Sequence, residues 1–340
     1  MDPAPRQLIN TRIKMKNAKI VINTNTWSRD TYELFDYECL TTLSQNYYTS
    51  SSCNLIRLGN NIEFLDMPPE SESDVLATIS KDFSNYWIQK SKSDLWLVVK
   101  SLDQGYDIEE NDIIKFGRVK LRVKFLKTNN SEYLTNTNTT KPEDSCRICL
   151  SDENQKDNPL ISPCSCTESM KFIHLNCLKT WFNSKIQKAL NQNSICYYWK
   201  NIDCEVCKKP FEHYMGLLEI GALGDKELKE NSCMILESVE KDKGNSRGLH
   251  LIRFTDDETL KIGRGHESQI KLFDISVSRF HASIEYCRGK VVLRDNHSKF
   301  GTLVEVLDKY EVFEDVVMQS GRTTVALKLD YSGGSSTSED

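Results

Sequence analysis

Four closely spaced pairs of potential metal ligands lie between residues 146 and 207, and they constrain this part of the chain more than any other feature. The pairs are Cys146 and Cys149, Cys164 and Cys166, His174 and Cys177, and Cys204 and Cys207. Two donors on one tight turn can share a zinc ion, so eight donors fill two tetrahedral sites and leave no position for water. The sequence therefore predicts two structural Zn²⁺ ions in a small domain over 142–215 that folds with its metal.

The remaining cysteines and the bulk composition narrow the class of protein. Eight of the 12 cysteines fall within the ligand-rich stretch, which indicates metal binding in a reducing compartment rather than disulfides, and Cys196 is expected to be an ordinary thiol outside the pairs. The net charge of −5 argues against a nucleic-acid-binding protein. Neither an apolar signal core nor a membrane-spanning run is visible. We therefore expect a cytoplasmic and/or nuclear protein with no membrane partner, neither secreted nor membrane-spanning.

Polar stretches divide the chain into three blocks. Residues 127–141 have the composition of a polar linker, and residues 332–340 that of a disordered tail. Short strand-like runs broken by turn residues fill blocks 18–126 and 230–331, without sustained helical periodicity. The sequence thus predicts a multidomain fold, with a mostly-β domain on each side of a small α+β zinc domain, and a β-sandwich is the natural class for the β blocks.

The two β blocks share an internal echo. The stretch 106–125 matches the stretch 310–329 at a constant offset of 204, including a Gly-Arg pair at Gly117-Arg118 and at Gly321-Arg322. Two interpretations are open. Either two unrelated hairpins have similar turns, or the first block is a diverged copy of the third.

The zinc-binding stretch resembles a known family. The runs CRICL, PCSC, FIHLNCLKTWF and CEVCKKPF resemble the RING-CH or RING-variant zinc finger, whose ligand order is four cysteines, one histidine and three cysteines. The resemblance implies that the first and third pairs bind one zinc and the second and fourth pairs the other. The alternative is a PHD finger, which normally carries Trp two residues before its seventh ligand. Ile202 stands there, whereas Trp181 stands four residues after the sixth ligand, as in RING-variant domains.

The RING-variant resemblance implies a ubiquitin-protein ligase. Such a domain docks a charged ubiquitin-conjugating enzyme and acts by positioning, without a covalent intermediate. The implied contacts with that enzyme are Ile148, Trp181, Pro210 and Lys208. Because Glu205 follows the seventh ligand where many RING domains have proline, a non-catalytic adaptor that binds phosphoproteins is the alternative function. Transfer of a ubiquitin-like modifier is a further alternative.

The third block carries a second set of motifs. Gly263-Arg264 ends one predicted strand, the run Ser278-Arg279-Phe280-His281 opens another, and a Gly301-Thr302 turn follows a third. In this order and spacing they resemble a forkhead-associated (FHA) domain, a β-sandwich whose loops bind phosphothreonine peptides. The first block has no such motifs, so as a copy it is expected to be a degenerate FHA-like domain that does not bind.

The FHA resemblance implies a phosphate site built from clustered donors. A phosphate monoester carries about two negative charges and three acceptor oxygens, which suit a guanidinium fork, a hydroxyl and further cations. The expected contacts are Arg264, Ser278, Arg279 and Lys299. We expect His281, Gly301 and Thr302 to brace the loops. Phe300 stands where the family usually has an asparagine, so the backbone contact of that asparagine is absent. The implied partners are a ubiquitin-conjugating enzyme and a phosphothreonine-containing substrate.

Overall fold

The structure, a computed structural model, forms two compact units. It describes residues 19–29, 31, 34–39, 42–67, 75–83, 85–127, 145–190, 194–200, 203–209, 211, 232–239, 246–254 and 258–330. The first unit combines residues 1–105 with 299–340, and the second holds residues 106–298. These units differ from the contiguous blocks 18–126 and 230–331 expected from the sequence, because the first unit includes the C-terminal strands. The expected linker beyond Lys127 and the expected tail lie outside the described residues.

The first unit is a β-sandwich made from both ends of the chain. Its strands are β1 (Lys19–Trp27), β2 (Thr42–Thr49), β3 (Cys53–Leu58), β4 (Asn61–Leu65), β5 (Val75–Asp82), β6 (Asn85–Lys90), β7 (Trp96–Val98), β21 (Thr302–Glu305), β22 (Lys309–Val312), β23 (Val316–Ser320) and β24 (Thr323–Asp330). One sheet has the order β21-β7-β23-β24-β1-β2, and the other β22-β6-β5-β3-β4. A 3-10 turn, Val99–Ser101, follows β7.

Strand β1 shows why this sandwich needs the C-terminal strands. Its residues alternate between buried and partly exposed, as a strand with one face on a core requires. It pairs antiparallel with β24 along its length, with Ile20 opposite Leu329 and Ile22 opposite Leu327. Ile20, Ile22 and Leu327 are at most 1% exposed. Residues more than 300 positions apart in the sequence therefore form one hydrophobic core.

The second unit contains another β-sandwich and the zinc-binding stretch. Its elements are β8 (Tyr106–Asp107), β9 (Ile113–Phe116), β10 (Val119–Lys127), β11 (Leu160–Ile161), the 3-10 turn Glu168–Met170, β12 (Ile173–His174), α1 (Leu175–Lys185), β13 (Ile186–Leu190), β14 (Ser194–Lys200), β15 (Cys233–Ser238), β16 (Ser246–Arg253), β17 (Glu258–Gly263), β18 (Ile270–Lys271), β19 (Ala282–Cys287) and β20 (Lys290–Asp295). One sheet runs β13-β14-β16-β15-β10-β9, and the other β18-β17-β19-β20-β8.

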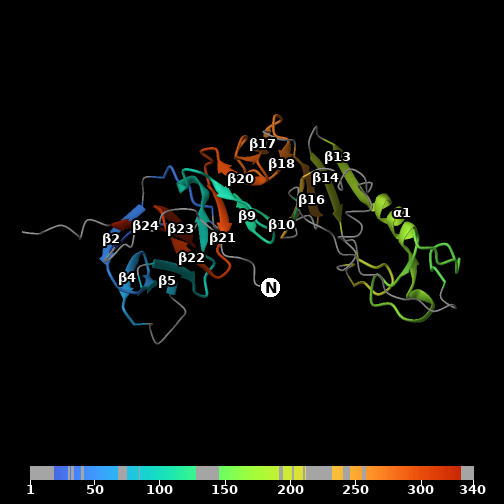
Figure 1. Cartoon of the computed structure of the whole chain (residues 1–340), viewed down its shortest axis with the longest axis horizontal. Coiled ribbons are helices and arrows are strands. Elements are labelled where there is room, and N and C mark those ends of the chain that lie inside the picture. The colour runs from blue at the N-terminus through green and yellow to red at the C-terminus, as the bar shows by residue number, and fades with distance from the viewer. Residues whose placement is uncertain are drawn as a thin grey trace, which may run out of the picture. The chain divides into compact units, whose positions relative to one another are not determined.

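The two sandwiches have matching strand orders. The series β2-β1-β24-β23 in the first unit corresponds to β16-β15-β10-β9 in the second, and the five-stranded sheets correspond strand by strand. In each unit, three equivalent strands come from the other half of the chain: β22, β23 and β24 in the first unit, and β8, β9 and β10 in the second. Figure 1 shows this by colour: red β22, β23 and β24 lie among blue strands, and green β9 and β10 lie among orange and brown ones. The segments that echo each other in sequence, 106–125 and 310–329, thus form equivalent strands.

The zinc-binding stretch is inserted between two neighbouring strands of the second sandwich. Strand β10 ends at Lys127 and β15 begins at Cys233, and these two residues are cross-strand partners. The hairpin β13–β14, which lies between the sixth and seventh expected ligands, pairs with β16 and so extends the same sheet. Buried side chains of the zinc-binding stretch also form one hydrophobic cluster with Ile235, Leu249 and Leu251 of this sheet.

The architecture agrees with the predicted fold class. The chain is a multidomain, mostly-β protein with a small zinc-binding region of mixed α and β structure and a β domain at its N-terminal end. Helix α1 is its only α-helix among the described residues. Within that part of the chain, no helix has the length and apolar character needed to span a membrane.

Candidate functional site

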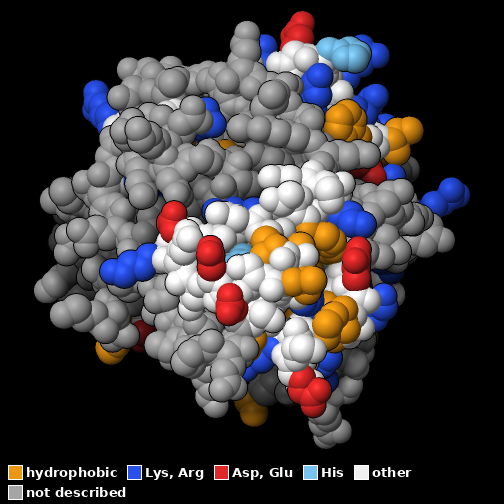
Figure 2. Space-filling model, turned by 90° about the vertical axis from the view of Figure 1, so that its right-hand side faces the viewer, with side chains coloured by type: hydrophobic (Ala, Val, Ile, Leu, Met, Phe, Trp, Pro, Cys, Tyr) orange, Lys and Arg blue, Asp and Glu red, His pale blue; other side chains and the backbone are white. Residues whose placement is uncertain are grey.

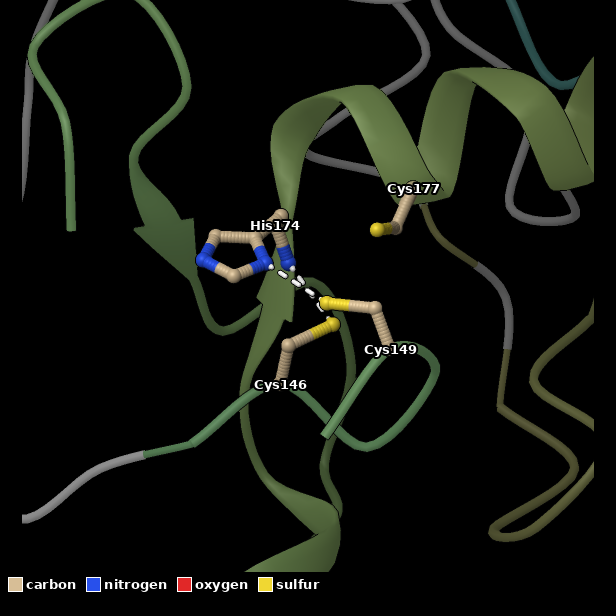
Figure 3. Close-up of side chains that lie close together, drawn as sticks. All are labelled: Cys146, Cys149, His174 and Cys177. Carbon is tan, nitrogen blue, oxygen red and sulfur yellow. Dashed lines mark hydrogen bonds between the residues drawn. The ribbon is translucent and has the colours of Figure 1, made fainter. Parts of the chain in front are cut away.

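The eight expected metal ligands come together in two groups of four. Cys146, Cys149, His174 and Cys177 form one group, and Cys164, Cys166, Cys204 and Cys207 form the other. In each group the donor atoms lie within 4.8 Å of one another. Figure 3 shows the first group, with two sulfurs from one turn, the imidazole from the end of β12 and the Cys177 sulfur from α1, all pointing toward a common centre. This is the interleaved grouping that the family resemblance implied.

Two turns of the same geometry present the first and last pairs of cysteines. In the first, Leu150 N–H donates to Cys146 O at 2.8 Å, and Leu150 has a positive φ of 63°. In the other, Lys208 N–H donates to Cys204 O at 2.9 Å, with φ 58° at Lys208. Each turn aims backbone N–H groups at the sulfur of its first cysteine. The left-handed residue is therefore what closes each turn around its sulfur.

These turns also favour the thiolate that a zinc ligand needs. Burial raises the pKa of the Cys146 thiol, but hydrogen bonds from the backbone N–H groups of Cys149, His174 and Ile148 outweigh it and hold the pKa below its ordinary value. The pKa of Cys204 is lowered in the same way, against burial, by the N–H groups of its own turn. Because only the thiolate binds zinc, each group contains one cysteine prepared for metal by the backbone.

The histidine of the first group is held by a hydrogen bond on the side of its ring away from the ligands. His174 Nε2 lies 2.5 Å from the backbone oxygen of Glu153, and since a carbonyl oxygen only accepts, Nε2 carries the proton. Nδ1 is the nitrogen that faces the ligand group, and it lies 3.2 Å from Cys149 Sγ. A second hydrogen bond that fixes the ring in this way is usual for metal-binding histidines. His174 is therefore ready to bind zinc through Nδ1.

Arg147 links the two ligand groups, which sequence reasoning did not anticipate. It stands between Cys146 and Ile148 in the first ligand turn, yet its guanidinium contacts the second group, 3.4 Å from Cys204 Sγ and 3.7 Å from Cys164 Sγ. It also donates to Met170 O at 2.6 Å. A cation beside thiolates stabilises their charge. The only signal in the sequence was an arginine placed directly after a ligand.

The donor sets fit zinc. Three thiolates with one imidazole, and four thiolates, are both common structural zinc sites. In a tetrahedral site with zinc–sulfur bonds of about 2.3 Å, ligand atoms are separated by about 3.7 Å, and the separation of Cys166 Sγ and Cys204 Sγ is 3.6 Å. Zinc bound by four protein ligands has no open position, so it would hold the fold together and would not activate water.

Apolar side chains are exposed on the two ligand turns. Ile148 is 46% exposed, Leu150 81% and Val206 50%, where Ile148 and Val206 occupy the same position in their respective turns. Figure 2 looks at the side of the molecule that carries the zinc-binding stretch and shows apolar side chains gathered there between charged ones. Exposed aliphatic residues held at metal-fixed turns are suited to binding another protein.

The other expected contacts with a conjugating enzyme differ in their surroundings. Trp181 on α1 is partly buried, and its ring packs edge-on against Phe182 and Phe211 at centroid distances of 5.3 and 5.7 Å. Lys208 is exposed directly after the last ligand. Pro210 lies outside the described residues. Glu205, which stands where a proline is usual, forms an exposed ion pair of 3.3 Å with Lys185 at the end of α1.

In the second sandwich, the strand end at Gly263-Arg264 meets the start of the 278–281 run. Arg264 N–H donates to Ser278 O at 3.0 Å and Gly265 N–H donates to Arg279 O at 2.8 Å. A Cβ on Gly263 would lie 2.3 Å from Arg279 O, so only glycine allows this approach. The Arg264 side chain is exposed, and its Nε donates to Val277 O at 3.2 Å. The guanidinium is therefore oriented while the rest of its fork stays accessible.

The buried side chain of His281 holds the backbone of Ser278. Its ring is fully buried, and its Nδ1 accepts a hydrogen bond from Ser278 N–H at 3.0 Å. Phe116 from β9 lies edge-on to the imidazole at 5.7 Å. Arg264, Ser278 and Arg279 are thus brought together in one unit, and His281 lies beneath them.

The remaining expected residues of this site belong to the first unit. Lys299 Nζ lies 3.3 Å from an Asp36 carboxylate oxygen. Gly301 has φ 73°, and a Cβ there would lie 2.7 Å from the Tyr37 ring, so the turn packs against that ring. Thr302 is fully buried. Gly301 therefore packs within the first unit.

Comparison with known protein families supplies the identity of two regions. Residues 146–207 match the RING-variant domain, and residues 260–323 match the FHA domain. Both resemblances expected from the sequence are confirmed. The chain is similar to the human protein named probable E3 ubiquitin-protein ligase MARCHF10, 31% identical over 36% of this chain and 13% of that protein. It is also similar to Arabidopsis thaliana probable E3 ubiquitin ligase SUD1, 41% identical over 20% of this chain and 5% of that protein.

These matches cover parts of the molecules. The chain spans less than a sixth of the length of the two curated relatives. A solved structure from a study of phosphothreonine-dependent FHA domain interactions is 24% identical, with a TM-score of 0.16, over 24% of this chain and 84% of that one.

Proposed function

We propose that this chain, which carries a RING-variant domain over 146–207 and an FHA domain over 260–323, is a ubiquitin-protein ligase that recruits phosphothreonine-containing substrates. The observation that carries the proposal is the pair of closed ligand groups behind two turns with exposed aliphatic residues. A closed zinc site has no catalytic metal chemistry of its own. The domain would act by holding a ubiquitin thioester and a substrate amine in reactive geometry.

The conjugating enzyme would dock on the ligand turns and α1. Exposure of Ile148 and Val206 at matching turn positions supports an apolar contact there. Trp181, partly buried against aromatic side chains, would offer its accessible edge. Pro210 is a further contact proposed from the sequence. Lys208, exposed and next to the last ligand, would supply a cation to the bound ubiquitin. The two zinc-fixed turns would keep these groups in position without an ordering cost on binding.

Discharge of a ubiquitin thioester tests the ligase activity. Purified full-length protein with zinc is added to conjugating enzymes charged with ubiquitin, and release onto free lysine is followed. We expect acceleration by wild type and a loss of about tenfold for Ile148→Ala, as truncation of a central interface residue commonly produces. Ile275→Ala is the matched control, because Ile275 is also an exposed isoleucine, at 80%, but lies in the FHA region. Equal losses in both variants would refute the docking surface.

Substrate recruitment would use the loops of the second sandwich. Arg264 would hold phosphate oxygens with its fork, while Ser278 and Arg279 would supply a hydroxyl and a second guanidinium. Lys299 is the further cation expected from the sequence, and it would add positive charge. Recruitment raises the local concentration of substrate near the thioester, so even modest peptide affinity accelerates transfer.

Phosphopeptide arrays test recruitment independently of ligase activity. We expect full-length protein to bind phosphothreonine peptides and to bind the unphosphorylated counterparts at least tenfold more weakly. Arg264→Ala should remove the difference, whereas Arg288→Ala, an exposed arginine in the turn between β19 and β20, should keep it. Equal binding of phosphorylated and unphosphorylated peptides by wild type would refute recruitment. Phosphopeptide binding without discharge by any conjugating enzyme would instead favour the non-catalytic adaptor.

A further inference from the structure

We propose that a turn from the N-terminal third of the chain, Gly117-Arg118, positions the phosphothreonine loop of the FHA region, and that it gets there because the two halves of the chain exchange equivalent strands. The proposal deepens the recruitment function proposed above and rests on it for its ligand. The FHA match covers residues 260–323 and so does not include this turn.

The turn is bound to the 272–281 loop that carries Ser278 and Arg279. Arg118 N–H donates to Ser276 Oγ at 2.9 Å. The Arg118 guanidinium forms an ion pair of 3.2 Å with Asp274. The same Asp274 oxygen accepts hydrogen bonds from Ser276 N–H at 2.8 Å and Ser276 Oγ at 2.6 Å. Both ends of the turn thus hold one tight three-residue bend of the loop.

Contact with Gly117 allows no added atom. Gly117 has φ 60°, and a Cβ there would lie 2.4 Å from Ser276 Oγ and 2.8 Å from Ser276 O. These distances are too short for a side chain, and the φ disfavours one as well. Glycine is therefore required both by the turn and by the approach of the loop.

Two sets of contacts connect this segment to the expected phosphate-binding residues. Ser276 precedes Val277, whose carbonyl oxygen accepts the hydrogen bond from Arg264 Nε. The residue before the turn, Phe116, packs on His281, whose Nδ1 receives Ser278 N–H. The segment 116–118 therefore supports the guanidinium on one side and the serine on the other. It acts through these residues and does not touch the ligand itself.

The duplicated turn makes the assignment specific. At the offset of 204, Gly321-Arg322 is the counterpart of Gly117-Arg118, and it lies in the first unit. Had each half kept its own strands, Gly321-Arg322 would brace the 272–281 loop. Instead, Arg322 donates to Gly59 O at 2.6 Å and to Ser28 O at 3.2 Å. The exchanged arrangement, in which β9 and β10 complete the second sandwich and β23 and β24 the first, thus decides which arginine serves the site.

Paired cysteines in the full-length protein test the exchange without any ligand. Thr26 and Thr323 face each other on β1 and β24, with their hydroxyl oxygens 3.1 Å apart. Thr26→Cys with Thr323→Cys should form an intramolecular disulfide, identified by mass spectrometry of the zinc-bound monomer. Thr26→Cys with Val119→Cys is the control, because Val119 corresponds to Thr323 at the offset of 204. A disulfide in the control pair and none in the first would overturn the exchanged arrangement.

Paired arginine variants test the positioning role. Arg118→Ala should weaken phosphopeptide binding about fivefold, the size of a partly exposed ion pair, and Arg118→Lys should restore most of it. Arg322→Ala should change affinity by less than twofold. Melting temperature is recorded for each variant, so that general destabilisation is separated from loss of binding. A larger loss for Arg322→Ala, or no rescue by Arg118→Lys, would refute the role. If wild type binds no phosphopeptide, recruitment fails, and the disulfides still decide the exchange.

Discussion

The two sandwiches share a strand order but differ where a ligand would bind. In the first unit, β3 turns directly into β4 through Gly59 and Asn60, and Leu58 pairs with Asn61. In the second unit, the equivalent strand β17 is followed by the longer loop 264–269, which begins with Arg264 and leads to β18 in parallel pairing. A tight two-residue turn in the first sandwich thus stands where the second sandwich has the loop that carries Arg264.

The repeated Gly-Arg turn also has different contacts in the two sandwiches. Arg322 in the first unit donates to backbone oxygens and so fastens its own sandwich. Arg118 in the second pairs with the carboxylate of Asp274 in a loop. One dipeptide at one topological position therefore serves closure in one sandwich and loop support in the other. A shared fold therefore leaves the use of its loops open.

Removing zinc should produce the largest difference in stability between the two sandwiches. The zinc-binding stretch shares a hydrophobic cluster with Ile235, Leu249 and Leu251 of the second sandwich. Among the described residues, none of the first sandwich belongs to this cluster. Structural zinc contributes on the order of 10 kcal/mol to folding. A chelator should therefore greatly increase hydrogen–deuterium exchange in β15 and β16 and leave β1 and β24 protected. Equal loss of protection in both units would contradict the comparison.

Core truncations at equivalent positions should each damage only one sandwich. Leu121 and Val325 correspond at the offset of 204, and both are fully buried. Leu121→Ala should cost about 2–5 kcal/mol, and Val325→Ala less because fewer methyl groups are lost. Hydrogen–deuterium exchange should rise in β15 for the first variant and in β1 for the second. The opposite pattern would show that the strands pair within their own halves.

Mild acid should weaken the second unit selectively. All 6 histidines of the chain lie between residues 174 and 297, so the first unit has none. Burial lowers the pKa of His250 to about 4, and it sits opposite Leu236 in β15 and Cys196 in β14. Between pH 6.5 and 4 the unfolded state binds a proton that the folded state does not, so stability falls as the pH falls.

The size of this effect follows from the same shift. A His250 pKa of about 4 against about 6.5 when unfolded removes about 1.4 kcal/mol at pH 5.5. Urea unfolding of the second unit, followed by hydrogen–deuterium exchange at pH 7 and 5.5, measures it. His250→Gln should flatten the pH dependence by that amount. An unchanged slope in this variant would show that His250 is not the group responsible.

Equivalent surface lysines should give the smallest difference. Lys124 pairs with Glu237 in the second unit, and its counterpart Lys328 pairs with Asp315 in the first. The pair in the second unit is 28% and 22% exposed, against 64% and 66% in the first. Lys328→Ala should leave the free energy of unfolding within about 0.5 kcal/mol, and Lys124→Ala should cost up to about 1 kcal/mol. Thermal melts in low and high salt measure both, and a larger cost at Lys328 would reverse the ranking.

Ligand chemistry was predictable from the sequence because it depends on local spacing. Two donors on one turn must share a metal, and the resemblance then gave the grouping that the structure has, with His174 beside Cys149. The FHA resemblance likewise implied that Arg264, Ser278 and Arg279 are neighbours, and backbone hydrogen bonds join these stretches. Such features need only a few neighbouring residues to be specified.

Strand partnership was not predictable, for a physical reason. The echo gives 106–125 and 310–329 the same pattern of apolar residues and the same turn, so either segment satisfies the pairing needs of either sandwich. Only the joint packing of all strands distinguishes the arrangements. The contact of Arg147 with the second ligand group and the addition of β13–β14 to the sheet depend on the same long-range assembly.

The facing positions of Lys127 and Cys233 have a consequence for the thermodynamics of the chain. Strands β10 and β15 can pair only if the intervening segment of about 100 residues closes into a loop, which costs about 4 kcal/mol for a flexible chain. A folded, zinc-bound domain within that segment reduces the length of flexible chain, and so lowers the entropic cost of closing the loop. Metal binding and sheet pairing are therefore linked through chain entropy, and each should tighten the other even without a direct contact between them.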